Sequence, residues 1–166
     1  RLARTSNGAI SFMESGKRRG FPDWKTFSTL SGPNSSNTQE IFSEQALTNI
    51  DDSFIGSFAY GPPMLLEGSV ISSSSTAGVY VFIDDEKRLL SSASYPAWGG
   101  SIDYNLAASQ LNQITTGVSA PILVKSTSDD AYIVNNAKKH LTPQSDFAKW
   151  GVAISDFEAV TDDLLD

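Results

Sequence analysis

Residues 79–90 read VYVFIDDEKRLL, and this stretch is the clearest indication of the secondary structure. A run of Val, Tyr, Phe and Ile leads to the polar pair Asp84-Asp85, and the chain resumes with the basic pair Lys87-Arg88 and two leucines. Apolar and aromatic runs on both sides of an Asx or Gly turn are typical of a β-hairpin. The stretch therefore predicts two antiparallel strands joined by a tight turn.

A short helix is predicted directly after this hairpin, within the sequence SSASYPAWGG. Tyr95 and Trp98 stand three residues apart behind serines, a spacing that places both side chains on one face of a helical turn. Gly99 follows them, and glycine commonly ends a helix because it adopts the left-handed conformation.

The same plan occurs in two other segments, ISFMESGKRRGFPDWKTFSTLSG from Ile10 and AYIVNNAKKHLTPQSDFAKWG from Ala131. Self-similarity of this kind indicates a repeat architecture. The corresponding residues are the turns Glu14-Ser15-Gly16 and Asn135-Asn136, the basic pairs Arg18-Arg19 and Lys138-Lys139, the helix pairs Phe27/Leu30 and Phe147/Trp150, and the glycines Gly32 and Gly151.

Each unit is predicted to close with a short helical element. These elements read SEQALTNI from Ser43, AASQLNQI from Ala107 and TDDLLD from Thr161. Proline stops the element that precedes it, so boundaries are expected at Gly61-Pro62-Pro63 and Ala120-Pro121. The predicted units are residues 1–60, 61–120 and 121–166.

We expect an α+β domain of three tandem repeats, each a β-hairpin with one or two short helices. The first unit carries a loop insertion, GPNSSNTQE, and the third stops at Asp166, so we expect it to be C-terminally incomplete. A unit of about 50 residues hardly buries a sufficient core alone, so the three units should pack together as one domain. A linear stack and a closed, pseudo-threefold arrangement both fit the sequence.

Composition narrows the class of protein. The chain of 166 residues has 12 Lys and Arg against 19 Asp and Glu, a net charge of -7, which is the wrong sign for neutralising nucleic-acid phosphates. No apolar run approaches the roughly 20 residues that a membrane span needs. Cys is absent, which excludes disulfides, thiolate metal sites and a cysteine nucleophile. With 25 Ser and 11 Thr against 19% charged residues, the composition favours an extracellular protein, secreted or on the cell surface.

The pattern resembles a known class of repeats. Apolar pairs such as Ile122-Leu123, a return strand rich in Lys and Arg, a helix ending in Trp-Gly and a closing Val-Thr-Asp-Asp-Leu-Leu are similar to repeats of about 50 residues in secreted bacterial proteins. They resemble the C-terminal accessory repeats of actinobacterial cell-wall hydrolases and surface proteins. The resemblance is strongest over residues 79–166 and weaker in the first unit, which lacks Trp-Gly. It implies a non-catalytic accessory module and transfers no ligand-binding residues.

Enzyme motifs are missing from the sequence, and we predict no catalytic residues and no cofactor. The sole histidine, His140, aligns in the repeats with Leu89 and Gly20, which favours an ordinary surface or edge-strand residue. Neither a Gly-x-Ser-x-Gly elbow nor a phosphate-binding glycine loop occurs. Six Glu and thirteen Asp are available for a glycosidase, yet nothing marks one pair.

Paired aspartates raise the question of a calcium site. None fits the calcium-loop pattern, and local roles at turns and helix starts are favoured, so no metal site is predicted. The pairs are Asp51-Asp52, Asp84-Asp85, Asp129-Asp130 and Asp162-Asp163.

Aromatic residues are the first candidates for ligand contact. Trp98 and Trp150 hold equivalent places, which favours core packing over a platform for a sugar ring. Trp24 has no aromatic equivalent in the other units, so it is the better candidate for an exposed contact. Tyr60 and Tyr104 are weaker candidates of the same kind.

Basic pairs are the second candidates. If the hairpins align, the pairs form a ladder that suits anionic wall polymers such as teichoic acids. The alternative, which we favour, is that Lys and Arg on edge strands deter unwanted strand pairing. The ladder would consist of Arg18, Arg19, Lys87, Arg88, Lys138 and Lys139.

We expect a non-catalytic module that attaches a secreted or surface protein to bacterial cell-wall glycan or anionic polymer. A structural spacer or a protein-interaction and adhesion module is the alternative, and a hydrolase domain is less favoured. Wall binding predicts exposed aromatic or basic clusters that are repeated on one face. A spacer predicts none, and an enzyme predicts one asymmetric cleft that contains carboxylates or His140.

Overall fold

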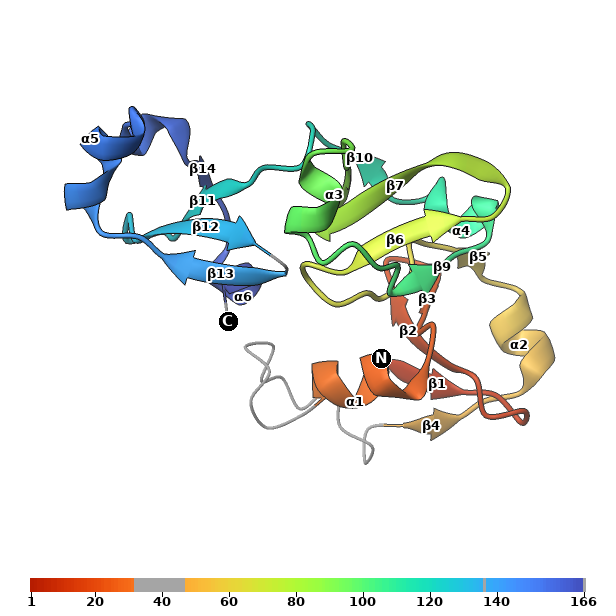
Figure 1. The fold of residues 1–166 in the computed structure, drawn as a ribbon. Helices are drawn as coiled ribbons and strands as arrows, with labels where there is room; N and C mark the ends of the chain where they lie inside the picture. The colour runs from red at the N-terminus through yellow and green to blue at the C-terminus, as the bar shows by residue number, and fades with distance from the viewer. Residues whose placement is uncertain (32–46, 136, 166) are drawn as a thin grey trace. The chain divides into compact units, whose positions relative to one another are not determined.

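The computed structural model describes residues 1–31, 47–135 and 137–165, and it has a mixed α+β fold with three sheets and short helices (Figure 1). The chain forms two compact units. The first contains residues 1–66 and 108–114, and the second contains residues 67–107 and 115–166.

Sheet A lies in the first unit and has the strand order β4-β1-β2-β3-β5. The first three strands form an antiparallel meander, and two-residue strands extend it in parallel at both edges. The strands are β1 (Leu2–Arg4), β2 (Ile10–Glu14), β3 (Lys17–Gly20), β4 (Thr48–Asn49) and β5 (Ala59–Tyr60).

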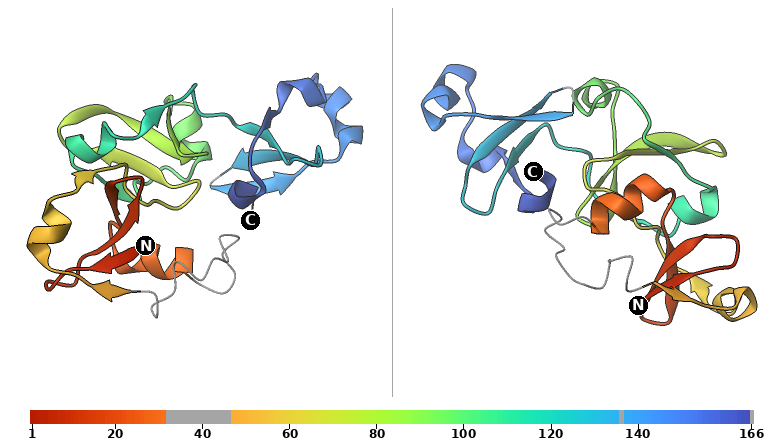
Figure 2. Two further views of the ribbon diagram at one scale, coloured as in Figure 1. Left: turned by 180° about the vertical axis from the view of Figure 1, so that it is seen from behind. Right: turned by 90° about the horizontal axis from the view of Figure 1, so that it is seen from below.

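Two helices accompany sheet A, and α4 (Ala108–Leu111) also belongs to this unit. The carboxylate of Asp23 accepts hydrogen bonds from Thr26 N and Oγ1 at the start of α1 (Trp24–Ser31), at 2.7 and 2.8 Å. Phe27 of α1 is fully buried in a cluster with Leu2 and Ile10, and α1 (orange) lies beside the red strands in both views of Figure 2. The helix α2 (Asp52–Gly56) connects β4 to β5.

Sheets B and C belong to the second unit. Sheet B has the order β10-β8-β7-β6-β9, and sheet C has the order β13-β12-β11-β14. The strands of sheet B are β6 (Val70–Ser73), β7 (Thr76–Ile83), β8 (Glu86–Leu89), β9 (Tyr104–Asn105) and β10 (Thr115–Thr116). Those of sheet C are β11 (Leu123–Lys125), β12 (Ala131–Asn135), β13 (Lys138–Leu141) and β14 (Glu158–Ala159).

The sheets of the second unit share one apolar core. Val70 and Val81 of sheet B and Val124 and Val134 of sheet C lie in the same buried cluster, together with Trp98. Short helical segments flank both sheets: α3 (Ser94–Ala97), η3 (Gln144–Asp146), α5 (Phe147–Trp150), η4 (Ile154–Asp156) and α6 (Asp162–Leu165).

All three predicted hairpins are present, as β2–β3, β7–β8 and β12–β13. Their turns use positive φ angles, 49° and 74° at Ser15 and Gly16, 53° and 60° at Asp84 and Asp85, and 57° at Ala137. Two-residue hairpin loops of type I′ require positive φ at both central positions, because only then does their twist match that of the strands. The Asx and Gly residues therefore located the first two turns correctly. The third turn, predicted at Asn135-Asn136, lies one residue later, because Asn135 is paired with Lys138 at the end of β12.

The closing helix of the first predicted unit lies elsewhere than expected. The element from Ser43 is predicted to be helical, but its residues Leu47 and Ile50 flank the strand β4. The helix that follows is α2. Asp51 caps α2, since its carboxylate accepts hydrogen bonds from the backbone and hydroxyl of Ser53. These hydrogen bonds, the one from the hydroxyl foremost, hold the pKa of Asp51 below its ordinary value.

The other helix predictions agree with the structure where it describes them. The segments from Ala107 and Thr161 contain α4 and α6, and Gly99 and Gly151 follow their helices at φ angles of 104° and 68°. The insertion at residues 32–40, the end of the first helix at Gly32, Asn136, the packing of the Trp150 side chain and Asp166 lie outside the described residues.

Candidate binding site

Trp24 is exposed, as the sequence predicts. It is the first residue of α1, and 57% of its surface is accessible. The indole ring leans on Phe27, with ring centroids 5.1 Å apart and planes inclined by 47°. Since Phe27 is buried in the core of the unit, Trp24 stands at the rim of that core and presents most of its ring to solvent.

Tyr60 and Arg18 lie together. The parallel pairing of β5 with β3 sets them opposite each other, and Gly61 N donates a 2.9 Å hydrogen bond to Arg18 O. The guanidinium carbon of Arg18 lies 3.7 Å from the centroid of the Tyr60 ring, and 61% of the Tyr60 surface is exposed. This geometry is a cation–π contact. We call Arg18 and Tyr60 the arginine–tyrosine site.

Arg19 has polar partners within the protein, whereas the contact found for Arg18 is with the Tyr60 ring. Its Nη1 lies 3.2 Å from Glu14 Oε2, and its Nε donates a 3.0 Å hydrogen bond to Pro62 O. Successive side chains of a strand point to opposite faces, so Arg18 and Arg19 are separated by the sheet although they are adjacent in sequence.

The second basic pair is buried. Lys87 and Arg88 retain only 8% and 7% of their exposed surface, and burial lowers the pKa of the Lys87 ammonium. An exposed ladder therefore does not continue through β8. Among the last pair, Lys138 is exposed and Lys139 is partly buried on β13.

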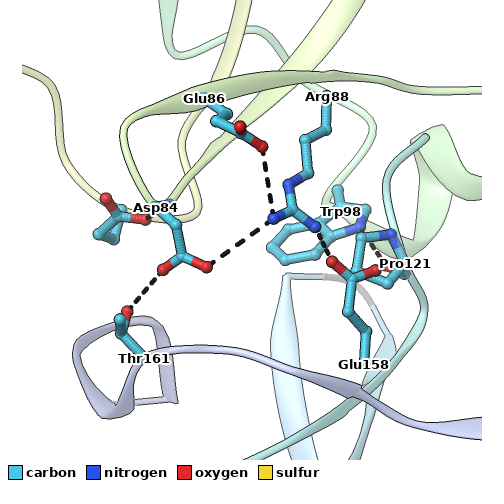
Figure 3. A network of polar contacts seen from close by, with 8 residues as sticks. Asp84, Glu86, Arg88, Trp98, Pro121, Glu158 and Thr161 are labelled. Atoms are coloured by element: carbon cyan, nitrogen blue, oxygen red, sulfur yellow. Dashed lines mark hydrogen bonds and ion pairs between the residues drawn. The ribbon is translucent and has the colours of Figure 1, made fainter. Parts of the chain in front are cut away.

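Arg88 is the centre of a polar network in the second unit (Figure 3). Its guanidinium pairs with Glu158 of β14, and its Nη2 lies 3.8 Å from Asp84 Oδ2 and 3.6 Å from Glu86 Oε2. Thr161 Oγ1 donates a 2.9 Å hydrogen bond to Asp84 Oδ1. The network therefore joins the β7–β8 hairpin to β14 and to the residue before α6, and its role is structural.

Trp98 and Tyr104 are buried, with 3% and 8% of their surfaces exposed. Trp98 Nε1 donates a 2.9 Å hydrogen bond to Pro121 O, which satisfies the one polar group of a ring in the core (Figure 3). The core position predicted for Trp98 is confirmed. Tyr104 pairs with Ile71 on β9, an edge strand of sheet B, and its burial leaves little ring surface for a ligand.

The strand register corrects the position of His140. Counted from the residue pair that closes each turn, His140 holds the same place on β13 as Arg88 on β8 and Arg19 on β3. The alignment of His140 with Leu89 and Gly20 is wrong by one residue, because it matched the basic pairs rather than the turns. His140 is exposed, in keeping with the surface residue expected.

Several of the paired aspartates lie in turns or accept local hydrogen bonds. Asp84, Asp85 and Asp129 lie in turns with positive φ, and Asp52 and Asp162 accept hydrogen bonds from Ser6 and Thr127. Within the described residues, no group of three or more acidic, His or Cys side chains is arranged to hold a metal ion.

Glu67 is a residue that the sequence did not single out. Burial, together with the charges of Asp84 and Asp85, raises its pKa to about 7, although Asp84 N donates a 3.0 Å hydrogen bond to Glu67 Oε2. No spacing or motif marks this position, because its environment is created by the turn of a hairpin 17 residues later in the chain.

Comparison of the chain with protein-family models, curated proteins and solved structures gave no match. None of the described helices combines the length and the apolar character that a bilayer crossing demands.

Proposed function

We propose that the chain is a non-catalytic module that attaches a secreted or cell-surface bacterial protein to cell-wall glycan or anionic wall polymer. The main observation that supports this proposal is the exposure of three aromatic rings in the first unit. Trp24, Phe54 and Tyr60 each keep more than half of their surface accessible. No other described aromatic side chain is as exposed, and flat apolar faces bordered by polar groups suit sugar rings.

We propose further that the three sheets are copies of one tandem repeat. In each sheet the first strand pairs antiparallel with the second, the second with the third, and a later two-residue strand pairs in parallel with the first. A side-chain contact also recurs: Asp52 accepts from Ser6 N at 2.9 Å, and Asp162 from Thr127 N at 3.3 Å. A linear stack and a pseudo-threefold ring would give different small-angle scattering profiles.

Co-sedimentation with purified Gram-positive cell walls tests the function. We expect the chain to pellet with the walls, and Trp24→Ala and Tyr60→Ala each to lower the affinity about tenfold, the effect of losing about 1.4 kcal/mol of contact energy. Leu141→Ala is the matched control, because Leu141 is an exposed apolar residue, 65% accessible, that belongs to sheet C. Absence of the wild-type chain from the pellet, with native walls and with walls stripped of anionic polymer, would refute wall binding.

A spacer or protein-interaction module is the second candidate, and the core shared by sheets B and C favours it. The buried valines of both sheets and the Arg88 network couple the sheets tightly, as stacked repeats in a rod require. A chain that stays in the supernatant but lengthens a parent protein would fit this role.

A further inference from the structure

The arginine–tyrosine site contains a cation without an acidic partner. Within the described part of the chain, the guanidinium of Arg18 makes no ion pair, and its buried Nε lacks a hydrogen-bond acceptor. Arg4, Arg19 and Arg88 each have a side-chain or backbone oxygen at hydrogen-bond or ion-pair distance from the guanidinium, although the buried Nε of Arg88 also lacks an acceptor. Acidic side chains are abundant in a chain with a net charge of -7, so a shortage of carboxylates does not explain why Arg18 lacks one among the described residues.

The guanidinium is held in place although no carboxylate of residues 1–31, 47–135 or 137–165 binds it. The Tyr60 ring supports one of its faces at 3.7 Å, and the pairing of β3 with β5 fixes the two backbones relative to each other. A preorganised cation loses less conformational entropy when it binds a ligand than a free side chain does. The site therefore has the geometry of a receptor for a charged group.

The chemistry of the two side chains defines the ligand. A guanidinium is planar and always charged, and its parallel N–H groups match the paired oxygens of a carboxylate or a phosphate. The exposed ring of Tyr60 adds an apolar surface beside the charge, on which a sugar ring can rest. The two groups together suit a sugar that carries an oxyanion better than a neutral sugar.

We propose that Arg18 and Tyr60 bind an oxyanion of a wall polysaccharide, a uronate carboxylate or a phosphodiester, with the attached sugar against the tyrosine ring. This inference rests on the proposed function, because it names the ligand class of the same module. The overall negative charge does not prevent binding, since charges separated by more than about 8 Å are screened at physiological ionic strength.

Isothermal titration calorimetry on the full chain tests the site with three probes: oligogalacturonate, poly(glycerol phosphate) and a neutral chitin oligosaccharide. We expect binding of at least one anionic probe and weaker binding of the neutral one. Arg18→Gln should weaken anion binding at least tenfold, because it removes the charge-assisted hydrogen bonds from the guanidinium to the oxyanion. Tyr60→Leu should weaken it as well, and thermal unfolding of both variants checks that they are folded.

Lys17→Gln is the matched control, because Lys17 is an exposed cation on the same strand and its loss changes the net charge equally. We expect it to change the affinity less than twofold. Equal losses in Arg18→Gln and Lys17→Gln would overturn the proposal, since general electrostatics would then explain binding.

The outcomes separate this inference from the proposed function. Wall binding with a preference for the neutral oligosaccharide, unaffected by Arg18→Gln, would overturn the oxyanion site and leave the wall-binding function intact. Anion binding that requires Arg18, in a chain that does not pellet with walls, would support the site and refute the function.

Discussion

The return strands β3 and β8 follow the same kind of hairpin and carry the same basic pair, yet the first residue of each pair, Arg18 or Lys87, has a different environment. The second residue, Arg19 or Arg88, pairs with a carboxylate in both strands. On β3, Arg18 rests on an exposed tyrosine ring. On β8, Lys87 and Arg88 are buried, and Arg88 faces three carboxylates. A basic pair after such a hairpin turn therefore does not by itself indicate a binding surface or an exposed edge strand. The segments that pack against the strand determine whether the pair is exposed or buried.

Replacement of a tryptophan in each unit should give the largest difference. Trp98→Ala should lower the free energy of unfolding by about 3–5 kcal/mol, because it opens a cavity in the core shared by sheets B and C. Trp24→Ala should cost less than about 1 kcal/mol, since Trp24 is mostly exposed. Urea denaturation followed by circular dichroism measures both values, and equal losses would contradict the burial described for these residues.

Replacement of the arginines tests the comparison directly. Arg88→Met should destabilise the chain by roughly 2 kcal/mol, because it leaves the partly exposed carboxylates of Asp84, Glu86 and Glu158 without their buried cation. Arg18→Met should cost only about 0.5–1 kcal/mol, the value of an exposed cation–π contact. The same denaturation experiment applies, and a stable Arg88→Met variant would show that the network contributes little.

Between pH 5 and 8, the stability should depend on the protonation of Glu67 in the second unit. Glu67 titrates at about 7 in the folded protein against an ordinary value of 4.5, so the folded state binds its proton more tightly than the unfolded chain. Its contribution to stability is therefore complete below pH 4.5 and is lost as the pH rises towards and through 7, by roughly 2 kcal/mol. Thermal unfolding between pH 5 and 8 measures this loss.

Glu67→Gln provides the control for that profile, because the amide resembles the protonated carboxyl at every pH. We expect the stability of the variant to change less with pH than that of the wild type between pH 5 and 8. At pH 8 the variant should be the more stable of the two. A parallel profile in the two proteins would assign the dependence to other groups.

Exchange of turn residues should give the smallest effect. Asp85 has a φ of 60°, which glycine adopts without strain, so Asp85→Gly should stabilise the chain by about 0.5–1 kcal/mol. Gly16→Asp, at a φ of 74° in the other hairpin, should destabilise it by a similar amount. Chemical denaturation of the two variants checks the opposite signs.

Local features of the fold could be predicted from the sequence. The hairpin turns were found because Asp, Gly and Asn tolerate positive φ, and the helices after them because Phe27, Trp98 and Phe147 follow cap-type residues. These signals act within about ten residues of the chain, where propensity and turn chemistry determine the structure.

The parallel edge strands could not be predicted in this way. Thr48–Asn49 and its counterparts are two residues long, and they are extended because a distant strand offers them hydrogen bonds. Leu47 and Ile50 have helical spacing, yet β4 lies between them. Pairing between distant segments outweighed the local pattern here.

For the candidate site, the sequence located exposed Trp24 and Tyr60 but not the burial of Tyr104, Lys87 and Arg88. Burial of a strand residue depends on which sheet packs against it, and the local sequence pattern is the same for the exposed and the buried basic residues. The lack of an ion pair at Arg18, among the residues that the structure describes, likewise depends on its neighbours in space, so only the structure could distinguish it from Arg19.

The parallel strands also determine the order in which the sheets can assemble. A hairpin such as β7–β8 brings together residues that are close in the chain and can form within microseconds. The parallel pairs Ile71–Tyr104 and Val124–Glu158 join residues that are more than 30 positions apart. Because closure of long loops is entropically costly and is not rewarded until the strand docks, the edge pairs form late. In native-state hydrogen exchange, the amides of Leu106 and Val160, which donate to Ser72 O and Lys125 O, would then open before those of the hairpins.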